Sequence, residues 1–118
     1  MAQLTRSTPV GFSASPTEPS ANQESLGDET EKKEYDSALS ALKESRYDEA
    51  EEKFSHFMQT YPQSKLSSNA YFWYAETFYR RGEFEKAGVH YLKGYKQFPK
   101  SSRASDFLLK LASSLGEI

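Results

Sequence analysis

Apolar residues recur at steps of three and four positions through most of the chain after residue 30. One clear run is Ala50, Phe54, Phe57 and Tyr61, and a second is Phe84, Ala87, Tyr91, Tyr95 and Phe98. This spacing places the apolar side chains on one face of an α-helix. The pattern predicts five helices, over roughly 31–44, 48–61, 68–81, 83–98 and 102–115.

The expected helix ends carry residues that favour termination. Gly82 follows the third helix at the point where a helix often adopts a left-handed residue, and Ser45 holds the matching place after the first helix. Pro62 and Pro99 follow the second and fourth helices. Each favours termination there, because proline has no N–H to donate to the helix ladder. These residues predict two helix-turn-helix units followed by one further helix.

The two units are related by an internal repeat. Ala38, Ala75 and Ala112 recur at an interval of 37 residues. At the same interval Ala50 matches Ala87, Tyr47 matches Phe84, Phe54 matches Tyr91, Tyr61-Pro62 matches Phe98-Pro99, and Ser64 matches Ser101. Small residues on both helices of a unit allow the pair to approach closely, and the aromatic residue beside them fills the remaining space. The units therefore bury their faces by stacking on one another.

Residues 1–30 differ from the rest of the chain. They contain Pro9, Pro16 and Pro19, many Ser and Thr, and only scattered apolar residues. Such a segment buries too little surface to offset the entropy of ordering it. We expect a disordered tail or linker there, with a docking motif around 10–12 as the less favoured alternative.

The order of small residue, aromatic residue, small residue, aromatic residue and proline resembles the tetratricopeptide (TPR) repeat. That resemblance implies an all-α, TPR-type α-solenoid of about two helix-turn-helix repeats plus one helix, wound as a right-handed superhelix. The repeats would span 31–67 and 68–104, with a partial third unit at 105–118. The interval of 37 residues is longer than the usual 34 of the family, so each junction would hold about three extra residues.

One stretch resembles a particular TPR subfamily. Residues 61–76 read Tyr-Pro-Gln-Ser-Lys-Leu-Ser-Ser-Asn-Ala-Tyr-Phe-Trp-Tyr-Ala-Glu, and 104–115 read Ala-Ser-Asp-Phe-Leu-Leu-Lys-Leu-Ala-Ser-Ser-Leu. Both are similar to the C-terminal domain of the Tol-Pal accessory proteins, the cell division coordinators called YbgF or CpoB. Matching positions in the first stretch and just beyond it are Tyr61, Pro62, Ser64, Leu66, Asn69, Ala70, Trp73, Glu76, Tyr79, Gly82, Phe84 and Ala87. Departures are Ala75 and Ala112 in place of glycine, Tyr74 in place of leucine, and Phe107 in place of alanine.

The resemblance implies a periplasmic protein that binds TolA and coordinates outer-membrane constriction with peptidoglycan synthesis during division. Family members usually also have an N-terminal coiled coil and a continued third repeat, and their absence here favours a shortened form. Two other TPR classes stay open as alternatives: the outer-membrane assembly lipoproteins, which also end 37-residue units in Tyr-Pro, and generic cytoplasmic scaffolds. The start of the sequence lacks the apolar stretch of a secretory signal.

The composition of the chain disfavours several classes of function. The net charge of −2 gives no reason to expect nucleic acid, and no apolar run is long enough to insert in a membrane. Cysteine is absent, which excludes disulfides and thiolate chemistry. His56 and His90 have no ligand-type neighbours in sequence, so surface histidines are expected rather than a metal or acid–base site. We expect a protein-binding module without a cofactor rather than an enzyme.

The first helices of the units should line a concave groove for a peptide or helix of the partner. The residues expected in this groove, or at its rim, are Tyr35, Leu39, Leu42, Lys43, Asn69, Phe72, Glu76, Tyr79, Arg80 and Leu109. Tyr71, Tyr74 and Phe78 should instead point into the helix packing. For the rings the alternative is that they only pack between neighbouring helices.

The last helix is more apolar than the terminal helix of a repeat protein usually is. Leu108, Leu111, Leu115 and Ile118 follow three- and four-residue steps on it. This pattern predicts either weak self-association or a helix that is missing from the face.

Overall fold

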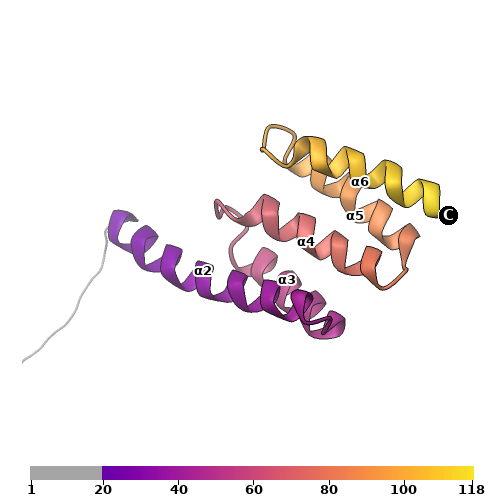
Figure 1. Ribbon diagram of the computed structural model, residues 1–118. Helices are drawn as coiled ribbons and strands as arrows, with labels where there is room; N and C mark the ends of the chain where they lie inside the picture. Colours follow the sequence, from indigo (N-terminus) through magenta and orange to yellow (C-terminus); the bar gives the residue numbers. More distant parts are fainter. Residues whose placement is uncertain (1–19) are drawn as a thin grey trace, which may run out of the picture. The chain divides into compact units, whose positions relative to one another are not determined.

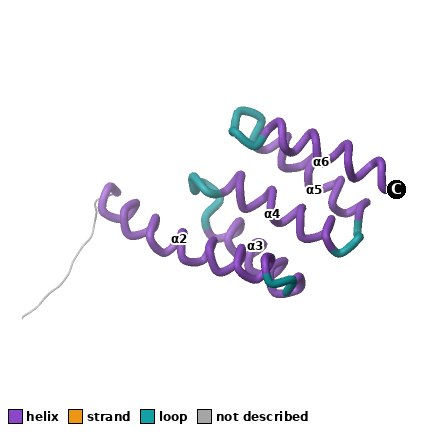
Figure 2. The backbone as a smooth tube through the Cα atoms, viewed as in Figure 1, coloured by secondary structure: helices purple, strands orange, loops and turns teal. Residues whose placement is uncertain are grey.

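The computed structural model describes residues 20–118, and within this range every regular element is an α-helix (Figure 1). The helices are α2 (Ser20–Lys43), α3 (Tyr47–Thr60), α4 (Ser67–Arg80), α5 (Phe84–Gln97) and α6 (Ala104–Glu117). Only short loops join α2 through α6 (Figure 2). The prediction of an all-α chain is confirmed, and the packing is consistent with a helical repeat.

The first helix is longer than expected. It begins at Ser20, so residues 20–30, which we expected to belong to a disordered tail, are helical. This stretch holds no proline, so nothing in it blocks the helix ladder, and a minority of its residues (Ala21, Gln23, Glu24, Leu26 and Glu29) have high helix propensity. The other four helices begin and end within about two residues of the predicted positions. The expected tail over 1–19 and the docking motif at 10–12 lie outside the described residues.

The chain divides into two units, Met1–Thr30 and Glu31–Ile118, and the second contains the helix packing described below. In this unit α3 packs on α4, α4 on α5, and α5 on α6. One cluster of buried residues joins the end of α2 to α3 and the start of α4, and a second joins α4, α5 and α6. Ala38, Ala50, Ala75 and Ala87 are all fully buried, as expected for helix pairs in close contact.

The turns repeat along with the helices. Ser45 and Gly82 both have positive φ, 63° and 83°, as the sequence predicts. The next N–H groups, of Arg46 and Glu83, bond back to the carbonyls of Ala41 and Phe78, which is the Schellman arrangement. At the junctions the hydroxyls of Ser64 and Ser101 each accept a bond, 3.0 Å long, from the N–H two residues later.

At the two junctions between repeats, a large side chain fills the corresponding space, but it comes from the earlier helix at one junction and from the later helix at the other. Between α3 and α4 the large side chain is Phe57 of the earlier helix, and the residue across from it in the repeat pattern is Ala70. Between α5 and α6 the sizes are exchanged, because Gly94 stands at the position of Phe57 and Phe107 at that of Ala70. All four positions are buried. A Cβ placed on Gly94 would overlap the ring of Phe107.

Arg81 joins the first repeat to the second by ion pairs. Its guanidinium lies 2.8 Å from Asp48 and also pairs with Glu51, both on α3, while Glu83 is 3.2 Å away in the following turn. The Arg81 side chain is only 17% exposed and that of Glu51 37%, so solvent screens this pair less than an ordinary surface pair, whereas the pair with the 99% exposed Asp48 is well screened. The start of α3 and the end of α4 are held together by them.

Gly94→Ala should destabilise the fold by about 1 to 3 kcal/mol, because the added methyl group meets the buried Phe107 ring. Gly88→Ala is the matched control on the same helix, since its Cβ would make ordinary contacts at 3.6 Å with Leu111 and Ser114. The control should be neutral or stabilising by up to about 1 kcal/mol through helix propensity. Urea denaturation of both variants measures the difference. Equal midpoints would contradict the packing at this junction.

Ser45→Gly should stabilise the fold by roughly 0.5 to 1 kcal/mol, because serine pays a steric cost at positive φ that glycine does not. The reverse change at the equivalent position, Gly82→Ser, should destabilise by a similar amount. Thermal denaturation followed by circular dichroism measures both. Shifts of the same sign in the two variants would argue against equivalent turns.

Candidate functional site

Three of the residues expected to line an open groove are buried in the core. Tyr35, Leu42 and Phe72 are 9%, 1% and 7% exposed. The Tyr35 ring packs edge-on against Phe54 and Phe57 of α3, and Phe72 lies among Phe107, Tyr91 and Trp73. The expectation that these three side chains face a partner is therefore wrong, because each is covered by the helices packed next to its own.

The other seven predicted residues remain at the surface to different degrees. Lys43, Arg80 and Leu109 are exposed, and Leu39, Asn69, Glu76 and Tyr79 are half-buried. The structure brings Glu76, Tyr79 and Arg80 together on α4, where they adjoin Lys110 of α6. Leu109 is 67% exposed and is treated below.

Glu76 is the centre of this polar group. Its carboxylate accepts a hydrogen bond from the Tyr91 hydroxyl and lies 3.3 Å from Arg80 Nε and 3.4 Å from Lys110 Nζ. The side chain is 12% exposed, and the two cations compensate for its burial. Burial and the bond to Glu76 both raise the pKa of Tyr91, so this phenol stays a hydrogen-bond donor. Glu76 therefore holds α4, α5 and α6 together.

Cations stack on aromatic rings on both sides of Glu76. The Lys110 ammonium lies 3.8 Å from the centre of the Tyr79 ring. Arg103 lies 4.6 Å from the Phe72 ring and 5.2 Å from Trp73, and it donates a 2.8 Å bond to Asn69. We call this surface the α4–α6 seam; it comprises Asn69, Trp73, Glu76, Tyr79, Arg80, Arg103 and Lys110.

Sequence reasoning missed three residues of the seam, namely Trp73, Arg103 and Lys110. The repeat relates two of these residues, since Trp73 and Lys110 occupy the same position in successive units. Arg103 has no such signal, because its equivalent in the first junction is Leu66. Its contact with Asn69 joins residues 34 positions apart and depends on the packing of α6 on α4.

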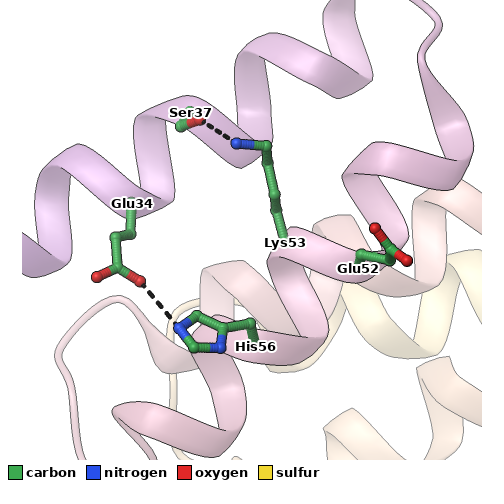
Figure 3. Close-up of a pocket in the computed structure, with 5 residues that line it drawn as sticks. All are labelled: Glu34, Ser37, Glu52, Lys53 and His56. Carbon is green, nitrogen blue, oxygen red and sulfur yellow. Dashed lines mark hydrogen bonds and ion pairs between the residues drawn. The ribbon is translucent and has the colours of Figure 1, made fainter.

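A separate hollow of about 310 Å³ lies between α2 and α3, lined by Glu34, Ser37, Glu52, Lys53 and His56. Figure 3 shows Lys53 and His56 reaching from α3 toward α2, while Glu52 points away from Glu34. Lys53 donates a 2.8 Å bond to Ser37, and His56 lies 3.6 Å from Glu34. Because these side chains bind one another and His56 is 67% exposed, the hollow is a pairing of two helix surfaces rather than a prepared ligand site.

His90 was expected at the surface, but its ring is half-buried. It stacks on Phe78 at 5.0 Å and contacts the rings of Tyr74 and Tyr71. These three rings point into the helix packing, as the sequence predicts. Burial lowers the pKa of His90 and the nearby Lys93 lowers it further; Glu51 opposes this shift, and Lys86 adds a smaller lowering. In the described part of the chain its Nδ1 has no hydrogen-bond partner.

The described residues contain no group of three or more His, Cys, Asp or Glu side chains placed to hold a metal ion. Among the helices that the structure describes, none combines the length and the apolar character needed to cross a bilayer.

The comparisons with known proteins add no family. No protein-family model matches the chain, and a search of curated proteins finds no match.

The half-buried His90 should make the stability of the fold depend on pH. Its pKa is lowered from the ordinary 6.5, so the unfolded chain binds a proton more readily than the folded one. The contribution of neutral His90 is present above about pH 6.5 and is lost as the pH falls through that value toward the lower folded pKa. His90→Phe, which cannot be protonated, should lose less stability than the wild type between pH 7.5 and 5.

Urea denaturation at a series of pH values measures this effect, and the exposed His56→Gln is the control. The control should follow the wild-type curve. Parallel curves for the wild type and His90→Phe would contradict the burial of the histidine.

Proposed function

We propose that this chain is a protein-binding adaptor of TPR type, a right-handed solenoid whose α4–α6 seam takes a peptide or helix of a partner. The observation that carries the proposal is the seam itself, where Tyr79, Arg80 and Lys110 form a surface around the half-buried Glu76. Tyr, Trp and Arg side chains dominate the binding energy of protein interfaces. Side chains of these three types lie together in the seam. Neighbouring side chains already hold them in place, which lowers the entropy lost on binding.

Binding is favoured over catalysis by the state of the charged groups. The carboxylate of Glu76 is occupied by Arg80, Lys110 and the Tyr91 hydroxyl, and Arg103 by Asn69 and Asp106. Groups paired in this way fix the positions of the side chains at a surface, but they are poorly placed to exchange protons with a substrate. The exposed faces of Arg80 and Lys43, which occupy equivalent positions in the two repeats, remain available to acidic groups of a partner.

The sequence motif supplies a concrete first partner. The stretch from Tyr61 to Glu76 resembles the Tol-Pal accessory family, and on that ground we propose TolA as the partner, the periplasm as the location, and the coordination of outer-membrane constriction with peptidoglycan synthesis as the role. The proposal rests on this resemblance and on the composition of the seam.

Titration of the chain with the periplasmic part of TolA, followed by calorimetry, tests the proposal. Arg80→Ala and Tyr79→Ala should each weaken binding by more than about 1 kcal/mol, which is a factor of about 5 in Kd. Phe72→Ala is unsuitable because Phe72 is buried, so its loss would disturb the fold itself.

Lys86→Ala and Lys96→Ala on α5 are the matched controls, since both remove an exposed cation outside the seam. They should bind as the wild type does. If all four variants bind equally, the partner uses another surface; if the wild type does not bind, TolA is not the partner and the family assignment loses its support.

A further inference from the structure

The outward face of α6 is apolar and uncovered by any helix that the structure describes. Leu108, Leu109 and Leu115 are 44%, 67% and 62% exposed, and Ala112 between them is exposed as well. Leu111, which we expected on this face, packs instead toward α5, where it adjoins Gly88. We call the face formed by Leu108, Leu109, Ala112 and Leu115 the α6 face.

The repeat shows what kind of element covers this face elsewhere in the molecule. Leu109 is equivalent to Tyr35 and Phe72, Ala112 to Ala38 and Ala75, and Leu115 to Ala41 and Phe78. All six equivalents are at most 9% exposed, in clusters with α3 or α5. In both complete repeats, therefore, the antiparallel second helix of the unit covers these positions, α3 in the first repeat and α5 in the second. The α6 face has the form of a surface that receives such a helix.

The positions of the charged residues on α6 leave this face without like-charge repulsion between two copies of the helix. With 3.6 residues per turn, the residues within about 60° of Ala112 around the helix are Ser105, Leu108, Leu109, Leu115 and Gly116. None of them is charged. The three charged residues of α6 lie away from this face and are held by their own chain: Asp106 by Arg103, Lys110 by Glu76, and Glu117 by the Tyr79 hydroxyl.

We propose that the α6 face binds the α6 face of a second copy of this chain, with the two helices antiparallel and crossing at Ala112. In a two-fold interface each residue on the axis meets its own copy, so a charge near the centre would be repelled, and the uncharged face avoids this. Leu109 and Leu115 lie three residues before and after Ala112, so each meets the other across the axis. The small Ala112 side chains permit the close approach that Ala38 and Ala75 permit within the repeats.

The size of the face sets the strength of the association. Three leucines and an alanine provide far less than the roughly 800 Å² per partner of a standard stable interface. The dimer should therefore be weak, with a Kd on the order of 10 to 100 µM. Because a two-fold contact is closed, association should stop at the dimer. The charged residues of the seam lie away from the α6 face, so both copies keep the seam open and the dimer is bivalent toward a seam partner.

Sedimentation velocity between about 5 µM and 1 mM tests the proposal. The wild-type chain should shift from monomer to dimer, and Leu109→Lys and Leu115→Glu should each weaken the dimer at least about tenfold. Val89→Lys is the matched control, because Val89 is a 50% exposed apolar residue on α5, and this variant should dimerise normally. Circular dichroism establishes that all variants are folded, as expected for changes at exposed positions.

A mixture of the two α6 variants tests the geometry. In the antiparallel pair, residue 109 of one copy meets residue 115 of the other, so mixing Leu109→Lys with Leu115→Glu places opposite charges together. The mixture should dimerise more strongly than either variant alone. A mixture no stronger than its components overturns the antiparallel arrangement.

Two other results overturn the proposal. A wild-type chain that stays monomeric up to 1 mM leaves the face to a helix of another protein. Association that the α6 variants do not weaken, or that grows beyond a dimer, shows that a different surface is responsible.

Discussion

The close approach of paired helices at fully buried alanines is the constraint on which the rest of this structure depends. Ala38, Ala50, Ala75 and Ala87 have no exposed surface, and none could be larger without separating two helices. The narrow gap determines where the large rings go, because Phe54 and Tyr91 must fill the space beside the alanines. It also determines that the Tyr91 hydroxyl reaches Glu76, since α5 lies close to α4. The polar seam is thus a consequence of apolar packing.

The junctions between repeats obey the same constraint with a different solution at each. A packed interface must keep its total side-chain volume, but either of the two helices can supply that volume. Here α3 supplies a phenylalanine at the first junction and α6 supplies it at the second. This freedom explains why Phe107 can stand at the repeat position of Ala70 while Gly94 lies opposite.

The fold was largely predictable from the sequence, because its signals are local. Helix ends follow from Ser45, Gly82, Pro62 and Pro99, each of which acts on its own backbone. Exposure was harder to predict, because it depends on neighbouring helices: Phe72 and Leu109 hold the same place in the repeat, and one is buried while the other is 67% exposed. His90 was misjudged for the same reason, since its aromatic neighbours come from α4. For the candidate site, spacing identified Glu76, Tyr79 and Arg80 but could not supply their partners on α6.

The exchange of sizes between Phe57/Ala70 and Gly94/Phe107 gives the repeats a fixed order. If the middle of the chain were cut out so that α3 were followed directly by α6, Phe57 and Phe107 would compete for one space. If α5 were instead followed by a copy of α4, Gly94 and Ala70 would face each other across a void. Each junction accepts only its own neighbour, so units that look interchangeable in sequence cannot be shuffled, duplicated or removed one at a time. Although the chain consists of repeats, its repeats can therefore only be retained together, as one set in one order.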